Sequence, residues 1–126
     1  MIKPILSTAA MLLALTAPAF ADGDAEKGEK VFKKCKACHA VGDDAKNKVG
    51  PMLNGIVGAP AAANPDFKYS DAMTGMAAEG LIWDEESLTA FLTKPKDFLK
   101  GTKMTFAGLR KAEDSENVIA YLATFN

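Results

Sequence analysis

The stretch Cys35-Lys36-Ala37-Cys38-His39 decides how this chain can fold. It has the form C-x-x-C-H, which is the attachment motif of covalently bound haem. Two thiols at this spacing can each add to a vinyl group of one haem and form thioethers, and the adjacent histidine can then ligate the iron. The motif contains both cysteines of the protein and its only histidine. The sequence therefore predicts one covalently bound haem c, held by Cys35 and Cys38, with His39 as an axial ligand.

Two other kinds of site use the same residue types. Cys35 and Cys38 could form a redox pair, because the cysteines of exported proteins usually form disulfides. The adjacent histidine, and the absence of a β-α-β pattern around the motif, argue against a thioredoxin-like site. A structural zinc site needs about four protein ligands, and the motif supplies the only three strong candidates. A thiol-redox or metal-binding protein without haem therefore stays as a less favoured alternative.

Residues 1–21 have the pattern of a secretory signal peptide. Lys3 provides the positive start, residues 5–15 are mostly apolar, and residues 19–21 (Ala-Phe-Ala) match a small-x-small cleavage site. The apolar run is shorter than the about 20 residues of a membrane span, which disfavours an uncleaved anchor. We expect cleavage after residue 21, a periplasmic location, and one domain over residues 22–126 without stable membrane insertion.

Charge is nearly balanced over the whole chain, with a formal net charge of −1 at pH 7, but it is unevenly placed. Residues 33–48 contain five lysines against two aspartates, and residues 94–111 contain six basic residues against one aspartate. Residues 66–86 contain six acids against one lysine. Because the domain as a whole is not basic, nucleic-acid binding is not expected.

Apolar spacing and capping residues predict an all-α domain with three main helices and long loops. Asp22 or Asp24 can cap the first helix, Asp84 the third, and Pro95 ends the third. Glycines and prolines are too frequent in the long loops for regular elements, and such loops usually carry function or wrap something. In chain order, the predicted elements are a main helix over residues 24–36, a loop over residues 40–70, a short helix over residues 70–79, and main helices over residues 84–94 and 112–124 with a loop over residues 96–110 between them.

The second axial ligand must be a residue other than histidine. The chain expected after cleavage contains Met52, Met73, Met76 and Met104, and each could simply fill a gap in the core. Met104 stands out because it lies in a loop after a helix that a proline ends. A neutral methionine sulfur favours ferrous iron and raises the potential, as in electron-transfer haems.

A series of motifs, in order and covering nearly all of residues 23–125, resembles the class I cytochromes c, and among them the soluble bacterial c2-type proteins and mitochondrial cytochrome c. Any one of these motifs alone would be weak, but the ordered series is specific. Besides C-x-x-C-H, the motifs are Gly28-x-x-x-Phe32, Gly50-Pro51-x-Leu53-x-Gly55, Phe67-x-Tyr69-Ser70-Asp71-Ala72, Trp83, residues 88–95, Gly101-Thr102-Lys103-Met104-x-Phe106-Ala107-Gly108 and Ile119-Ala120-Tyr121-Leu122.

The resemblance implies the cytochrome c fold wrapped around one haem, with His39 and Met104 as axial ligands. The carbonyl of Pro51 would accept a hydrogen bond from the other ring nitrogen of His39. Tyr69 and Trp83 would donate hydrogen bonds to the haem propionates. A further implication is that Gly28 and Phe32 pack against Tyr121 where the first and last helices cross.

Four residues depart from the family's common pattern. Phe91 stands where many relatives have a tyrosine whose hydroxyl approaches the methionine sulfur. Ala59 and Met73 remove polar partners from the propionate side, and Lys100 replaces a frequent proline before the methionine loop. These departures leave the tuning of the potential open.

By this resemblance we expect a monomeric single-electron carrier of a respiratory chain rather than an enzyme. Quinol–cytochrome c reductase is the expected donor, and the acceptor would be an oxidase, a photosynthetic reaction centre or a periplasmic reductase. A haem enzyme with an open sixth position is the competing class. The residues expected to surround the exposed haem edge and to attract acidic partners are Lys33, Lys34, Lys36, Lys96, Lys103, Arg110 and Lys111.

Overall fold

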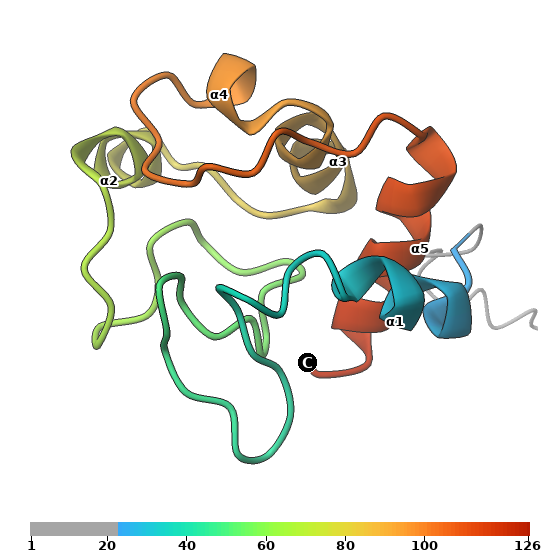
Figure 1. The fold of residues 1–126 in the computed structure, drawn as a ribbon. Helices are drawn as coiled ribbons and strands as arrows, with labels where there is room; N and C mark the ends of the chain where they lie inside the picture. The colour runs from blue at the N-terminus through green and yellow to red at the C-terminus, as the bar shows by residue number, and fades with distance from the viewer. Residues whose placement is uncertain (1–22) are drawn as a thin grey trace, which may run out of the picture.

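The computed structural model describes residues 23–126, and the predicted signal peptide lies outside the described residues. Five helices form within them (Figure 1). They are α1 (Ala25–Phe32), α2 (Asp71–Ala78), α3 (Glu85–Thr93), α4 (Pro95–Phe98) and α5 (Ala112–Ala123). No strand forms in this part of the chain, and the only β-pairing is one isolated antiparallel bridge between Pro60 and Ile82. The prediction of an all-α fold with long loops is confirmed.

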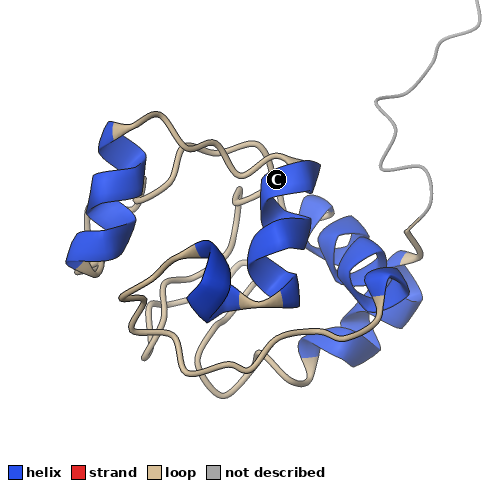
Figure 2. Ribbon diagram, turned by 90° about the horizontal axis from the view of Figure 1, so that it is seen from above, coloured by secondary structure: helices blue, strands red, loops and turns tan. Residues whose placement is uncertain are grey.

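Helices lie at two opposite ends of the molecule, and loops connect them. The helices α1 and α5 lie side by side at one end, and α2 lies at the other end in both views (Figures 1 and 2). The long loop between α1 and α2 covers the lower part of the molecule in Figure 1, opposite α3 and α4. The chain therefore surrounds its interior mainly with loops rather than with a helical bundle.

Two predicted boundaries are wrong. The first helix ends at Phe32 rather than near residue 36, because residues 33–38 form tight turns instead. The N–H of Cys35 bonds to the carbonyl of Phe32, three residues back, at 2.8 Å. The predicted loop over residues 96–110 contains most of α4, which starts at Pro95. Proline ends one helix here and begins the next, because the first turn of a helix needs no N–H from that residue.

The predicted capping residues are confirmed. Asp24 Oδ1 accepts hydrogen bonds from the N–H groups of Glu26 and Lys27 at the start of α1. Asp84 Oδ1 accepts the N–H of Ser87 at 2.8 Å at the start of α3, and hydrogen bonds from Ser87 lower the pKa of the Asp84 carboxyl. These side chains satisfy N–H groups that have no partner within the helix, so the caps position the helix starts.

The crossing of α1 and α5 depends on Gly28. A Cβ atom at this residue would overlap the carbonyl oxygen of Asn117 and would lie 2.7 Å from Tyr121 Cβ. The rings of Phe32 and Tyr121 pack with centroids 5.5 Å apart. The packing of Gly28 and Phe32 against Tyr121, implied by the resemblance, is confirmed.

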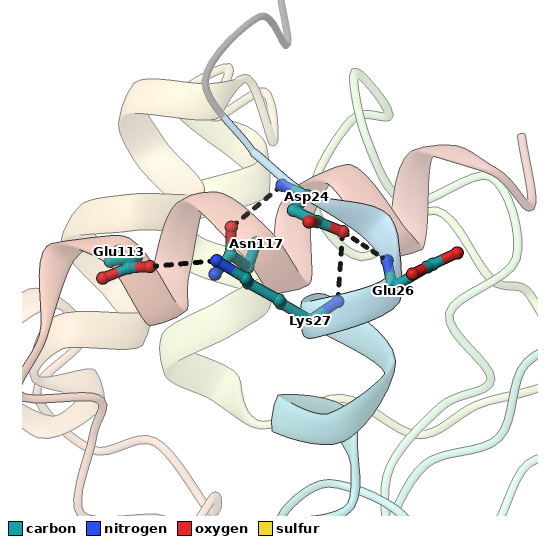
Figure 3. A network of polar contacts seen from close by, with 5 residues as sticks. All are labelled: Asp24, Glu26, Lys27, Glu113 and Asn117. Atoms are coloured by element: carbon teal, nitrogen blue, oxygen red, sulfur yellow. Dashed lines mark hydrogen bonds and ion pairs between the residues drawn. The ribbon is translucent and has the colours of Figure 1, made fainter.

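Polar contacts hold the start of α1 on α5 (Figure 3). The N–H of Asp24 donates to Asn117 Oδ1 at 2.9 Å, and Asn117 is buried. The nearby ion pair joins Lys27 Nζ to Glu113 Oε1 over 3.9 Å and is exposed, so it adds little to the stability of the fold. Since C-x-x-C-H follows α1 directly, this attachment to α5 also fixes the place of the motif.

Candidate haem site

The two cysteines of the motif lie half-buried in the turns that follow α1, and both are free thiols. The N–H groups of Cys38 and His39 both bond to the carbonyl of Cys35, at 3.1 and 2.9 Å. Burial raises the pKa of the Cys35 thiol, Lys34 lowers it in part, and Cys38 raises it further. A reactive redox pair usually needs a thiol with a lowered pKa, so the chemistry here does not favour the thioredoxin-like alternative.

The His39 ring is held in one orientation. Its Nδ1 atom lies 2.7 Å from the carbonyl oxygen of Pro51, and since a carbonyl only accepts, Nδ1–H is the donor. Burial lowers the pKa of His39, and the bond to Pro51 raises it in part. When the ring is deprotonated, its lone pair is on Nε2, which is the form that ligates a metal.

Gly50 allows the loop to lie against the His39 ring. A Cβ atom at residue 50 would lie 2.8 Å from Nδ1 and 2.9 Å from Nε2 of His39, closer than real side chains approach. The N–H of Gly50 also donates to the carbonyl of Cys38 at 2.9 Å. No role for Gly50 could be predicted beyond its place in a motif, because the close approach depends on the folded loop.

Asn47 and Asn64, to which the sequence assigned no site role, tie the long loop together. Asn47 Oδ1 accepts the backbone N–H of Met52 at 3.0 Å and the side-chain amide of Asn64 at 2.9 Å. The backbone N–H of Asn64 donates to the Tyr69 hydroxyl oxygen at 3.0 Å. The only signal in the sequence was their position among glycines and prolines, which is typical of turns.

Tyr69 and Trp83 are the residues implied to bind the haem propionates. Because the Tyr69 oxygen accepts from Asn64, its hydroxyl proton is left to donate to another acceptor. Trp83 is buried, and its ring packs on Phe91 and Phe98 with centroids 5.2 and 6.2 Å apart. The propionate contacts themselves stay predictions.

Met104 lies in the loop after α4, half-buried against the core. Its N–H donates to Thr102 Oγ1 at 3.2 Å. Met73 and Met76, both on α2, are half-buried like Met104. The degree of burial therefore does not distinguish Met104 from these two methionines. The assignment of Met104 as the second axial ligand stays a prediction.

Within residues 23–126, no group of three or more histidine, cysteine, aspartate or glutamate side chains gathers as a metal site. The same part of the chain contains no helix that is long and apolar enough to span a membrane.

Comparison with known proteins identifies relatives over most of the chain. The family model described as Cytochrome c matches residues 25–126. Cytochrome c2 of Agrobacterium tumefaciens (strain II Chrys) is 52% identical over 101 residues, which are 80% of this chain and 91% of that protein. Cytochrome c2 of Rhodomicrobium vannielii is 51% identical over 112 residues, covering 89% of this chain and 87% of that protein.

A solved structure supports the same family assignment. The structure of cytochrome c2 from Rhodospirillum centenum superposes with a TM-score of 0.79 at 41% sequence identity. The match covers 82% of this chain and 99% of that one. The resemblance drawn from the ordered motifs, and the fold that it implied, are confirmed.

Proposed function

Because the chain belongs to the cytochrome c family, we propose that it is a periplasmic carrier of single electrons with one haem c. Cys35 and Cys38 would bind the haem through thioethers, with His39 and Met104 as axial ligands. The observation that carries this proposal is the bond of His39 Nδ1 to the Pro51 carbonyl. This bond leaves Nε2 as the one imidazole nitrogen that can ligate a metal. His39 follows the two free thiols of Cys35 and Cys38 in the chain.

The residues present fit this cofactor. Two free thiols lie in one turn, the ring of His39 is oriented by Pro51, and Met104 lies in a loop further along the chain. When bound, haem supplies an iron that gains or loses one electron. Pro51 and Gly50 hold the ring of His39 in place, and Met104 would supply a thioether as the second ligand. With no position vacant, a carrier is favoured over an enzyme.

Gly23, two residues after the predicted cleavage site, is packed on α5, which supports a domain that includes this residue. A Cβ atom on Gly23 would overlap the carbonyl oxygen of Glu116 in α5 and would lie 2.8 Å from Ala120 Cβ. Gly23 is therefore packed tightly on α5, and α1 begins two residues later. We propose export with cleavage after residue 21, which would leave this packed start intact.

The basic residues expected around the haem edge are available to a partner. Every one of them is exposed in the structure: Lys33, Lys34, Lys36, Lys96, Lys103, Arg110 and Lys111. Clustered charge of one sign steers association with an oppositely charged partner and makes its rate dependent on salt. We propose an acidic face of quinol–cytochrome c reductase as the donor's docking site, and an oxidase, photosynthetic reaction centre or periplasmic reductase as acceptor.

Reversal of two of these charges tests the function. The double variant Lys34→Glu, Lys103→Glu should be reduced by purified quinol–cytochrome c reductase about tenfold more slowly than wild type at low salt. The difference should shrink as salt screens the charges. Stopped-flow absorbance of the haem measures the rate.

Lys68→Glu is the control, because Lys68 is also exposed but lies in the acidic segment over residues 66–86. Its rate should stay close to that of wild type. Equal losses in both variants would contradict steering by the proposed surface, and a wild-type protein that the reductase does not reduce would contradict the proposed donor.

A further inference from the structure

Asn54-Gly55 is the only place in the chain where an asparagine precedes a glycine. At such a pair the backbone nitrogen of the glycine can attack the side-chain amide carbon of the asparagine, because a residue without a Cβ atom hinders the approach least. Both residues are exposed, so water can reach them. The chemistry of this pair is spontaneous deamidation, and the contacts around the pair decide whether that reaction can begin.

The folded structure holds the amide that would be attacked. Asn54 Oδ1 accepts the N–H of Gly42 at 2.9 Å, and Asn54 Nδ2 donates to the carbonyl of Gly42 at 2.7 Å. The side chain thus pairs with both backbone groups of one residue. Ring closure onto the next backbone nitrogen reorients the side chain, so this pairing opposes the reaction.

The attacking nitrogen is held as well. The N–H of Gly55 donates to the carbonyl of Phe125 at 3.1 Å, in the turn that follows α5. The nitrogen becomes a nucleophile only when it loses this proton, and a bonded N–H releases its proton to water only when the bond opens. The site is therefore protected while the end of the chain stays against the long loop (Figure 1).

Few contacts hold this last turn, which comprises residues 124–126. The Phe125 ring packs on Tyr121 with centroids 5.1 Å apart, and Asn126 Nδ2 donates to the carbonyl of Val57 at 2.9 Å. Phe125 is half-buried and Asn126 is exposed. Terminal segments with few buried contacts open at a much lower free energy than the whole domain. Opening of the last turn therefore releases the N–H of Gly55 while the core stays folded.

We propose that Asn54-Gly55 is a deamidation site and that the last turn controls its rate. The nitrogen of Gly55 forms a bond to the side-chain carbon of Asn54, and the amide nitrogen leaves as ammonia with the proton of Gly55. Water then opens the five-membered imide and leaves aspartate or isoaspartate at residue 54. The inference concerns the covalent lifetime of the protein and does not depend on the proposed electron transfer.

The product weakens the segment that follows His39. The N–H of Leu53 donates to the carbonyl of Ala40 at 3.0 Å, so the pairing of Asn54 with Gly42 extends a contact that begins one residue after the histidine. A carboxylate can accept the N–H of Gly42 but cannot donate to its carbonyl. An oxygen then faces an oxygen where Nδ2 donated, and half of the pairing is lost.

The first experiment incubates the purified wild-type holoprotein at mildly alkaline pH and locates aspartate and isoaspartate by peptide mass spectrometry. Residue 54 should be modified first. Asn47, Asn64 and Asn117 are controls within the same molecule, because none of them precedes a glycine. Earlier modification at another asparagine, or none at residue 54, would overturn the assignment of the site.

Two variants test control by the last turn. Phe125→Ala removes the packing on Tyr121 and should deamidate at residue 54 about tenfold faster than wild type. Asn126→Ala removes only the side-chain bond to Val57, so it keeps the apolar packing if the first variant fails to fold. Its rate should rise about threefold, as expected for the loss of one exposed hydrogen bond.

Phe98→Ala is the matched control for Phe125→Ala. Phe98 is also half-buried and packs on other aromatic rings, but it lies on α4, opposite the long loop (Figure 1). Its rate of deamidation at residue 54 should stay close to that of wild type. A wild-type rate in both variants of the last turn, or an equal acceleration by Phe98→Ala, would overturn control by the last turn.

Asn54→Asp carries the product and tests its effect on the fold. Urea unfolding should show an equilibrium constant for folding about threefold lower than that of wild type. Asn54→Ala, which loses both bonds to Gly42 without adding charge, should show a loss of similar size. A stability of Asn54→Asp equal to that of wild type would overturn the proposed effect of the product.

Discussion

Replacement of Met104 by leucine is expected to lower the midpoint potential by on the order of 0.2 V, within the range that axial ligands control. The near-infrared sulfur-to-iron band of the ferric protein should disappear. Leucine keeps nearly the same volume, so the loop should stay packed while the sulfur is lost. The ferrous variant should also bind carbon monoxide, which wild type should not bind.

Met76→Leu is the control for this experiment, because Met76 is half-buried like Met104 but lies on α2. The potential and the spectrum of this variant should match wild type. If Met76→Leu shows the large fall and Met104→Leu does not, the second ligand has been assigned to the wrong methionine.

Replacement of Gly28 by alanine is expected to destabilise the protein by about 3 kcal/mol. The added Cβ would overlap the backbone carbonyl of Asn117 and would lie 2.6 Å from its carbon. Backbone atoms cannot turn away as a flexible side chain can, so α1 must move off α5. Urea unfolding measures the loss, monitored by the fluorescence of the single tryptophan, Trp83.

Gly75→Ala is the matched control within another helix. Gly75 is exposed on α2, and a Cβ atom there meets nothing within 4 Å. Because alanine favours helix more than glycine does, this variant should gain about 0.5–1 kcal/mol. Opposite signs for the two glycines are the signature of the close crossing, and a loss of similar size at both would argue against it.

The starts of α2 and α3 could be predicted from the sequence because their capping is local. Ser70 and Asp84 each accept the N–H of the residue three positions on, Met73 and Ser87 respectively, and that pattern is visible in the chain itself. The end of α1 could not be predicted in the same way. Apolar spacing continues to Cys35, but it does not distinguish an α-helix from the tighter turns that replace it.

The candidate site shows the same difference between features that are local in the sequence and features that depend on the fold. The motif containing Cys35 and Cys38 is contiguous and could be recognised directly. The contact of His39 with Pro51 was implied only by the family resemblance. The bond between Asn47 and Asn64 was not foreseen, because it depends on how a loop without regular periodicity closes on itself.

The central claim is that the iron lies between His39 and Met104. Proton NMR of the ferrous wild-type protein, with ¹³C-labelled methionine methyl groups, tests it most directly. A methyl group held over the porphyrin ring is shifted far upfield by the ring current. The chain expected after cleavage contains Met52, Met73, Met76 and Met104. We predict one strongly shifted methyl signal, absent from Met104→Leu. Four unshifted signals, or a shifted signal that survives in Met104→Leu, would contradict the claim.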